Sequence, residues 1–396
     1  MFSRNKQKRP IYLDWAAATS LLPEAKAAME PWLTDNFANP SAIHAEGQVA
    51  RGAVEAARGR IAAALQVRPE FVTFTGSGTE ANNLAILGTI EARRQSGVAY
   101  SDMEVISTAI EHPSVSKTLA YAASLGVVVK IVPVKESGVI NVEALRTLVT
   151  NKTVLLSTHY VNSEIGTIQP TRVIKKVLKE AAPEAVLHID AAQAPLWLSC
   201  QFDTVAADIL TLDVGKCCGP KGVGLLVRSK GIQLKPVFFG GGQEAGLRPG
   251  TENVAGVVGA AEAFAWAQSG WRERAENVAV VRNQAIAHLL QEIPQALLNG
   301  AMLESDDRVA NNINISIPGL DTEFATVVLD SKGFAVSTKS ACSGAGGGES
   351  AVVKATTQDP ARAASTLRIT LGPDTTVEQL KQLTTVLKHH VAKLLP

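Results

Sequence analysis

The chain carries the stretch AVLHID at residues 185–190 and the stretch ILTLDVGK at residues 209–216. Each opens with a short apolar run of the length and pattern typical of a buried strand. Asp190 ends the first run, and Lys216 follows the second. Because ligands of open α/β sheets bind at the carboxyl ends of the strands, we expect both side chains at a ligand site. An ordinary ion pair at the rim of the sheet is the alternative interpretation.

Strand-like and helical patterns alternate from about residue 71 to residue 227, which predicts a mostly parallel sheet with helices on both faces. The strand-like runs cover residues 71–75, 104–107, 127–134, 153–158, 185–189, 209–212 and 224–227. The helical patterns in the same region and just before it cover residues 48–65, 79–94 and 170–181. The sequence therefore predicts an α/β fold.

The pattern changes after Asn253, where a long helical stretch reaches residue 293, an extended apolar run covers 312–317 and a helix closes the chain at 377–395. With 396 residues the chain is long enough for two domains. We expect a large domain over residues 19–262. A smaller α+β domain is expected from residues 1–18 and 263–396.

Composition excludes several classes of protein. Hydrophobic residues make up 46% of the chain and charged residues 19%, which favours a large core over disorder. The net charge of +1 argues against a broad nucleic-acid surface. The most apolar region, 254–267, is interrupted by Glu262 and is too short to span a membrane, and no signal-peptide pattern follows the basic first residues. We expect a cytoplasmic protein that binds neither nucleic acid nor membranes.

A carboxylate and a lysine at neighbouring strand ends are the groups that pyridoxal 5′-phosphate (PLP) needs. The lysine forms a Schiff base with the aldehyde, and the carboxylate keeps the pyridine nitrogen protonated so that the ring can accept electrons. Asp190 and Lys216 therefore make PLP the predicted cofactor.

Three further features suit the same cofactor. The stretch TGSGTE at residues 75–80 joins a strand to a helix and predicts either a phosphate cradle or a plain turn. His112 follows another strand and could stack on a planar cofactor, move a proton, or serve a structural role. Asn162 and Gln193 are amides beside strand ends, suited to the phenolate oxygen of PLP or to capping a turn.

The four cysteines are too few for a disulfide framework and lack the CxxC spacing of a zinc site, so no metal is expected. Cys342 lies in the small, polar, glycine-rich stretch STKSACSGAGGG at residues 337–348, which favours a nucleophilic cysteine over a buried structural one. Arg368 follows an apolar residue and could clamp a substrate carboxylate or lie at the surface.

The order of these motifs resembles that of the cysteine desulfurase family, PLP-dependent enzymes of the class V aminotransferase type and fold type I. The resemblance extends from Ile11 to about Thr376. It is carried by LD at 13–14, NPSAIH at 39–44, GTE at 78–80, EH at 111–112, NSEIG at 162–166, HIDAAQ at 188–193, Lys216 before GPKG, GGGQE at 240–244, RPGTEN at 248–253, SAC at 340–342 and Arg368.

The resemblance implies the residues that hold PLP. These are Gly78, Thr79, His112, Asn162, Asp190, Gln193, Lys216 and Thr251. Lys216 would carry the aldehyde, Asp190 would pair with the pyridine nitrogen, and His112 would stack on the ring and help to move protons. The two amides would bond the phenolate oxygen. The first turn at Gly78 and Thr79 would hold the phosphate, together with Thr251 from a partner subunit.

The resemblance also implies the reaction. Arg368 and Asn162 would hold the carboxylate of L-cysteine, and Cys342 would take its sulfur as a persulfide for an acceptor or scaffold protein, as in iron–sulfur cluster assembly. The products would be L-alanine and the persulfide, and the enzyme would be a homodimer. A selenocysteine lyase or another β-eliminating PLP enzyme is one alternative, and a degenerate, non-catalytic relative acting as a sulfur relay or scaffold is another.

The segment before the lysine departs from the family pattern. Where the family has Ser-x-His-Lys, with the serine and histidine on the phosphate, this chain has Asp213, Val214, Gly215 and Lys216. Two phosphate ligands are missing and one of them is replaced by an acid, which predicts a weaker hold on PLP.

Overall fold

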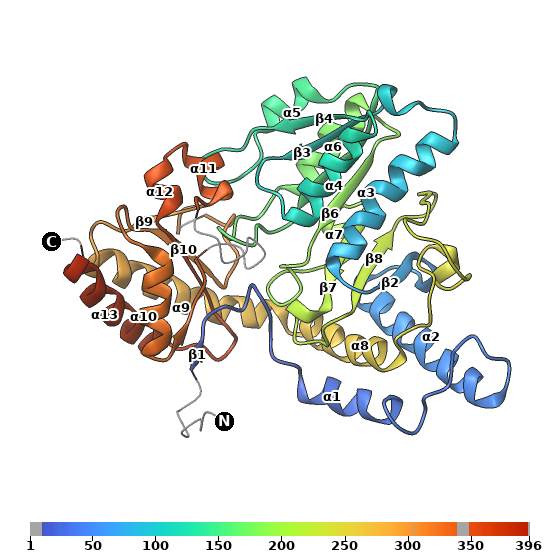
Figure 1. The fold of residues 1–396 in the computed structure, drawn as a ribbon, viewed down its shortest axis with the longest axis horizontal. Coiled ribbons are helices and arrows are strands. Elements are labelled where there is room, and N and C mark those ends of the chain that lie inside the picture. The colour runs from blue at the N-terminus through green and yellow to red at the C-terminus, as the bar shows by residue number, and fades with distance from the viewer. Residues whose placement is uncertain (1–9, 304, 339–347, 395–396) are drawn as a thin grey trace.

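A computed structural model describes residues 10–303, 305–338 and 348–394. Its largest element is a seven-stranded sheet in the order β2-β8-β7-β6-β5-β3-β4 (Figure 1). Only β8 runs antiparallel to its neighbours, so the sheet is mixed and mostly parallel, as predicted. The strands are β2 (Val72–Thr75), β3 (Glu104–Thr108), β4 (Val128–Val132), β5 (Thr153–His159), β6 (Val186–Asp190), β7 (Ile209–Asp213) and β8 (Gly224–Arg228).

Both faces of this sheet are buried, because successive apolar residues of each strand point to opposite sides. Leu155 of β5 packs with the face covered by α3 and α4, whereas Leu156 packs into the larger core on the other face. The helices of this part of the chain are α1 (Pro23–Met29), α2 (Ala45–Leu65), α3 (Gly78–Gln95), α4 (Pro113–Ser124), α5 (Val142–Leu148), α6 (Thr171–Ala181), α7 (Phe202–Val205) and α8 (Val254–Ser269).

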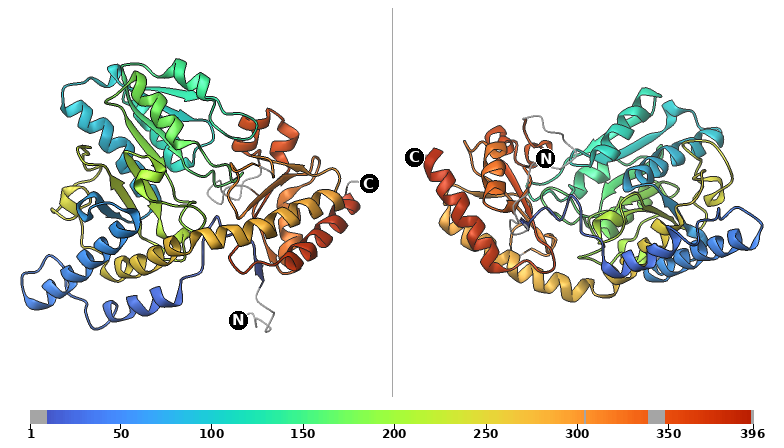
Figure 2. Two further views of the ribbon diagram at one scale, coloured as in Figure 1. Left: turned by 180° about the vertical axis from the view of Figure 1, so that it is seen from behind. Right: turned by 60° about the horizontal axis from the view of Figure 1, so that its bottom comes forward.

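The C-terminal part of the chain forms a separate lobe beside the sheet (Figures 1 and 2). Its antiparallel sheet has the order β12-β10-β9. The elements are α9 (Trp271–Glu292), β9 (Leu297–Leu298), β10 (Asn312–Ser316), α10 (Thr322–Ser331), β11 (Phe334–Ala335), α11 (Ala351–Thr357), α12 (Pro360–Ala364), β12 (Thr366–Thr370) and α13 (Val377–Leu394). The single helical stretch expected up to residue 293 is divided at Gly270 into α8 and α9, which run in succession from the large sheet to this lobe (Figure 2).

Residues 11–14 also lie in this lobe. The short strand β1 (Ile11–Tyr12) pairs in parallel with β11, and Asp14 bridges to Thr370 at the end of β12. The division into domains 1–18 with 263–396 and 19–262 stays a prediction.

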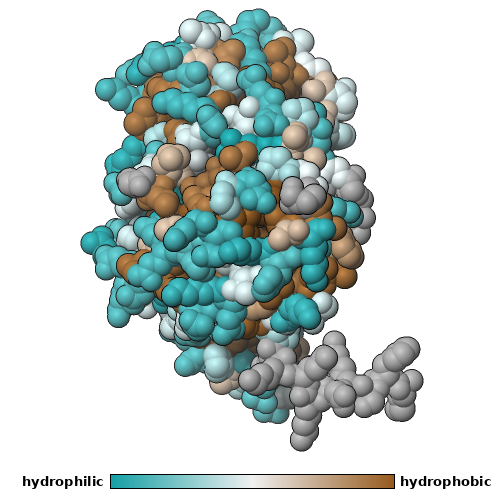
Figure 3. All heavy atoms as spheres, turned by 90° about the vertical axis from the view of Figure 1, so that its left-hand side faces the viewer, coloured by the Kyte–Doolittle hydropathy of each residue, from teal (hydrophilic) through white to brown (hydrophobic). Residues whose placement is uncertain are grey.

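The surface of the C-terminal lobe mixes hydrophilic and hydrophobic side chains, with hydrophobic ones near the middle of the face in Figure 3. Phe324 and Val327 of α10 are among its exposed apolar residues. In the described part of the chain, every helix is either too short or too polar to form a membrane span.

Candidate active site

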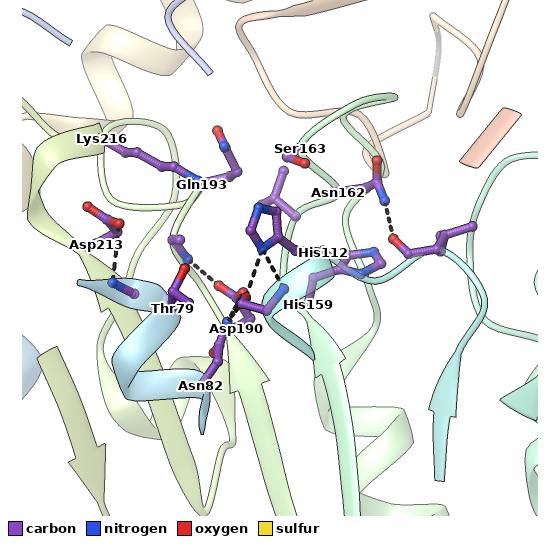
Figure 4. A pocket seen from close by; sticks show the side chains of 15 residues that line it. Thr79, Asn82, His112, His159, Asn162, Ser163, Asp190, Gln193, Asp213 and Lys216 are labelled. Carbon is purple, nitrogen blue, oxygen red and sulfur yellow. Dashed lines mark hydrogen bonds between the residues drawn. The ribbon is translucent and has the colours of Figure 1, made fainter. Parts of the chain in front are cut away.

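A pocket opens at the carboxyl ends of β5, β6 and β7, beside the start of α3 (Figure 4). Seven of the residues predicted from the sequence line it, namely Gly78, Thr79, His112, Asn162, Asp190, Gln193 and Lys216. They come together because parallel strands place their carboxyl ends at one edge of the sheet. The turns that follow those strands carry the functional groups.

Asp190 is buried at the floor of the pocket, at the last position of β6. One oxygen of its carboxylate accepts from Asn82 Nδ2 at 2.7 Å, and the other accepts from the backbone N–H of Ala192 at 3.0 Å. Asn82 lies one helical turn after Gly78 on α3, so the helix that begins at the pocket also holds its carboxylate. Asn82 Oδ1 is buried and has no hydrogen-bond partner among the described residues.

His112 caps the start of α4 with its ring. The backbone N–H of Ser114 donates to Nδ1 at 3.1 Å, and the Ser114 hydroxyl lies 2.8 Å from the same atom. Because a backbone N–H can only donate, Nδ1 carries no proton, and the neutral ring holds its proton on Nε2. Burial lowers the pKa of His112, and the charge of Asp190 opposes that shift only in part. The ring is therefore neutral and carries one N–H, on Nε2.

A hydrogen-bonded chain links the two groups. The Asn82 amide donates both to Asp190 and, at 2.8 Å, to the Ser114 hydroxyl that faces His112 (Figure 4). The carboxylate and the imidazole are thus positioned by one shared amide.

Lys216 ends the short helix η4 (Val214–Lys216), directly after β7. Its side chain lines the pocket, whereas Lys221 donates to the carbonyl of Thr19 at 2.6 Å and is not among the lining residues. Lys216 is the amine that faces Asp190 and His112 from the neighbouring strand end.

Asp213 is the last residue of β7, and its carboxylate reaches the start of α3. Its Oδ2 accepts from the N–H of Gly78 at 3.2 Å, and its Oδ1 accepts from the N–H of Gly215 at 3.0 Å. The predicted phosphate cradle therefore already contains a carboxylate.

These groups fit PLP at the ring. A buried acceptor, a lysine amine, a neutral imidazole and two amides face one pocket, and the orphan oxygen of Asn82 lies buried in its lining. The orientation of the Asn162 side chain is fixed by its Oδ1, which accepts from the N–H groups of Glu164 and Ile165 at 2.9 and 3.0 Å. At the phosphate end, the N–H groups at the start of α3 suit an anion. The carboxylate of Asp213 already accepts from one of these N–H groups, that of Gly78.

Two predicted residues of the described part of the chain lie outside the pocket lining. Arg368 of β12 is 1% exposed and donates to Asp14 at 2.7 Å and to the carbonyl of Ser163, a lining residue, at 3.1 Å. Thr251 is exposed on the loop before α8. Cys342 falls outside the described residues.

Sequence reasoning missed several lining residues, namely Asn82, Ser114, His159 and Ser163. Spacing could have found two of them, because Asn82 is four residues after Gly78 on a helix and His159 ends a strand as Asp190 does. Among the described residues, no cluster of three or more His, Cys, Asp or Glu side chains could hold a metal ion.

The sequence matches the family model described as aminotransferase class-V over residues 11–383, so the chain belongs to this family.

Relatives within that family are cysteine desulfurases, as the resemblance predicted. The chain is 35% identical to cysteine desulfurase IscS of Dictyoglomus turgidum, over 98% of this chain and 96% of the relative. It is 33% identical to cysteine desulfurase IscS 1 of Archaeoglobus fulgidus, over 97% of each.

Solved structures agree with the fold. A NifS-like protein superposes with a TM-score of 0.88 at 30% identity and covers 97% of this chain and 100% of its own. SspA in complex with cysteine superposes with a TM-score of 0.77 at 30% identity, over 91% of this chain and 99% of its own. The PLP fold type I predicted from the sequence is thus confirmed.

Proposed function

We propose that this protein is a PLP-dependent L-cysteine desulfurase that converts L-cysteine to L-alanine and leaves the sulfur on Cys342 as a persulfide. The observation that carries the proposal is the convergence of Lys216, Asp190 and His112 on one pocket. When bound, PLP supplies a conjugated electron sink for the bonds at the Cα of an amino acid.

Each polar group of the pocket has a separate task in this proposal. Lys216 would hold PLP covalently and, once its amine is free, carry a proton to and from Cα. Asp190, fixed by Asn82, would keep the pyridine nitrogen protonated. His112 would lie against the ring and deliver a proton from Nε2, the nitrogen that its contacts with Ser114 leave protonated. Asn162 and Gln193 would bond the phenolate oxygen.

The substrate would be held from the C-terminal lobe. Arg368, with Asn162, would take the carboxylate of cysteine; its guanidinium contacts Asp14 in the structure, and its Nε has no hydrogen-bond partner among the described residues. The Cys342 thiolate would then attack the substrate sulfur. The S–Cβ bond breaks, the new S–S bond forms, and Cβ takes up a proton, which yields alanine.

Two described residues flank the segment that carries Cys342, and both bond residues that neighbour the pocket lining. Ser337 pairs with Arg368 through both backbone groups, at 3.1 and 2.7 Å. Ser350 bonds the carboxylate of Glu164, two residues after Asn162. These anchors support delivery of the thiol to the pocket and of sulfur to an acceptor protein. An iron–sulfur cluster scaffold is the proposed acceptor.

The working unit would be a homodimer in the cytoplasm. Phe37, Ile43 and Phe239 are large apolar side chains that are 84%, 94% and 87% exposed, on the loop before α2 and the loop after β8. Those loops face one groove, lined from both sides by Pro40, Ser41, Gly242 and Gln243. A second copy of the chain would cover these apolar side chains, and Thr251 of each subunit would reach the cofactor phosphate of the other. An active monomer at micromolar concentration would contradict the dimer.

The test combines a spectrum with product analysis. Purified protein supplied with PLP should show a visible absorbance band, form alanine and sulfide from cysteine, and give a label at Lys216 after borohydride reduction. Lys216→Ala should lose the band, the label and the activity. Label at Lys221 instead would refute the assignment.

The same assay distinguishes a cysteine desulfurase from the two alternative functions. Faster release of selenium from selenocysteine than of sulfur from cysteine would favour a selenocysteine lyase. Absence of any PLP band in the wild type would favour a non-catalytic sulfur relay.

A further inference from the structure

The carboxylate of Asp213 occupies the end of the pocket where the cofactor phosphate is expected. It accepts from Gly78 N, the first N–H of α3 (Figure 4). It also accepts from Gly215 N. The first N–H groups of a helix have no partner inside the helix, and the helix dipole favours an anion beside them. Asp213 therefore supplies the start of α3 with a negative partner from the protein itself.

Two glycines make room for this carboxylate. An added Cβ at Gly78 would lie 3.1 Å from Asp213 Cβ and 3.2 Å from Oδ2. An added Cβ at Gly215 would lie 3.2 Å from Asp213 Oδ1 and 3.7 Å from the Cα of Lys221. Any side chain at position 215 would press on the carboxylate or on the backbone beyond it. Glycine at position 215 is thus compatible with the carboxylate at position 213, whereas a side chain at 215 would crowd it.

Resting on the proposed function, we propose that Asp213 is an internal competitor of the cofactor phosphate. Its carboxylate stabilises the start of α3 in the cofactor-free protein and must turn away before the phosphate binds. The competition acts at the phosphate end, because the carboxylate of Asp213 accepts from the N–H groups of Gly78 and Gly215, whereas Asn82 and the N–H of Ala192 hold Asp190 at the ring. It should therefore weaken binding of PLP and leave binding of pyridoxal, which lacks the phosphate, nearly unchanged.

A substitution of Asp213 that raises the affinity for PLP but lowers the melting temperature would distinguish this role from a purely structural one. Asp213→Ala removes both the competitor and the carboxylate that accepts from the N–H groups of Gly78 and Gly215. The affinity for PLP should rise about tenfold or more, since a carboxylate and a phosphate at about 4 Å repel strongly even at an effective dielectric near 20. The affinity for pyridoxal should stay within about twofold. The melting temperature of the cofactor-free protein should fall by about 1–3 °C, the usual effect of losing one cap in a chain of this size.

The experiment measures the dissociation constants of PLP and pyridoxal by absorbance titration, and the melting temperature without cofactor, for the full chain. Asp213→Asn keeps the size of the side chain without its charge and serves if the alanine variant folds poorly. Asp321→Ala is the matched control, because Asp321 caps α10 through Phe324 N at 3.0 Å, outside the pocket lining. It should lower the melting temperature and leave both affinities unchanged.

The pairing with Gly215 has its own test. Gly215→His alone should destabilise the protein and weaken PLP binding, whereas Asp213→Ser combined with Gly215→His should bind PLP more tightly than the wild type.

Equal shifts of PLP and pyridoxal affinity in Asp213→Ala, or no gain for PLP, would overturn the role of Asp213. That result differs from failure of the proposed function, in which neither compound binds any variant and borohydride labels no lysine.

Discussion

Removal of Glu244 should destabilise the protein more than removal of any surface acid, because Glu244 completes a buried ion pair. Arg58 of α2 donates to both of its oxygens at 2.8 Å, and the N–H of Phe74 donates to one of them at 2.9 Å. The two side chains are 10% and 2% exposed. Burial works to lower the pKa of Arg58, but the bonds and charge of Glu244 outweigh it, so the pKa lies above its ordinary value.

The magnitude follows from what Glu244→Ala leaves behind. Arg58 keeps its charge in a buried site, where it retains bonds to the Val72 carbonyl and to Glu55, and the N–H of Phe74 loses its acceptor. Breaking a buried ion pair by removing one partner costs about 3–5 kcal/mol. Against a total stability of about 5–15 kcal/mol, this is a large fraction.

Chemical unfolding at fixed protein concentration, followed by circular dichroism, measures the cost. Glu180→Ala is the control, since Glu180 pairs with Arg146 at 2.8 Å in an exposed position and should cost less than about 1 kcal/mol. Arg58→Met combined with Glu244→Ala removes both charges and should cost less than Glu244→Ala alone. The reasoning would be refuted if the double variant were less stable than Glu244→Ala. It would also be refuted if Glu244→Ala lost no more stability than Glu180→Ala.

Three further predictions concern the pocket and its surroundings. Asn82→Leu should lower the affinity for PLP about 10- to 100-fold, because hydrogen bonds to charged groups contribute about 1.5–3 kcal/mol; unchanged binding would mean that Asp190 needs no support from α3. Burial lowers the pKa of His188 to about 4. Between pH 6.5 and 4, His188 therefore binds a proton in the unfolded chain but stays neutral in the folded protein. Stability should therefore fall by about 3 kcal/mol across that window as the pH drops, and His188→Asn should lack this component in pH-dependent unfolding. Cys342→Ser should keep the PLP spectrum and lose sulfide release from cysteine, and persistent release would assign the persulfide elsewhere.

The sequence predicted the parts of the fold that follow from local pattern. The apolar runs ending at Asp190 and Asp213 are strands, and the pocket lies at their carboxyl ends because parallel strands share one edge. Contacts between distant segments carry no local signal. The pairing of β1 with β11 is one example, and the two-residue length of each strand leaves no periodicity to detect.

The site shows the same limit. Lys216 and His112 could be found from motifs, but the bond from Asn82 to Asp190 joins positions 108 residues apart. The sequence shows an aspartate at position 213. That its carboxylate points to the N–H of Gly78 depends on how the end of β7 packs beside the start of α3. Arg368 was expected to face the substrate, and its contact with Asp14 depends on the N-terminal segment lying in the C-terminal lobe.

The pairing of β1 with β11 also dictates an order of events on the ribosome. All strands of the large sheet lie between Val72 and Arg228, so that sheet can assemble while the rest of the chain is still being made. Ile11 pairs with Phe334, and at about 5–20 residues per second the first strand waits on the order of 20–60 s for its partner to be synthesised. Arg368 acquires its contact with Asp14 later still. The arginine proposed to receive the substrate is therefore among the last parts of the nascent protein to be put in place.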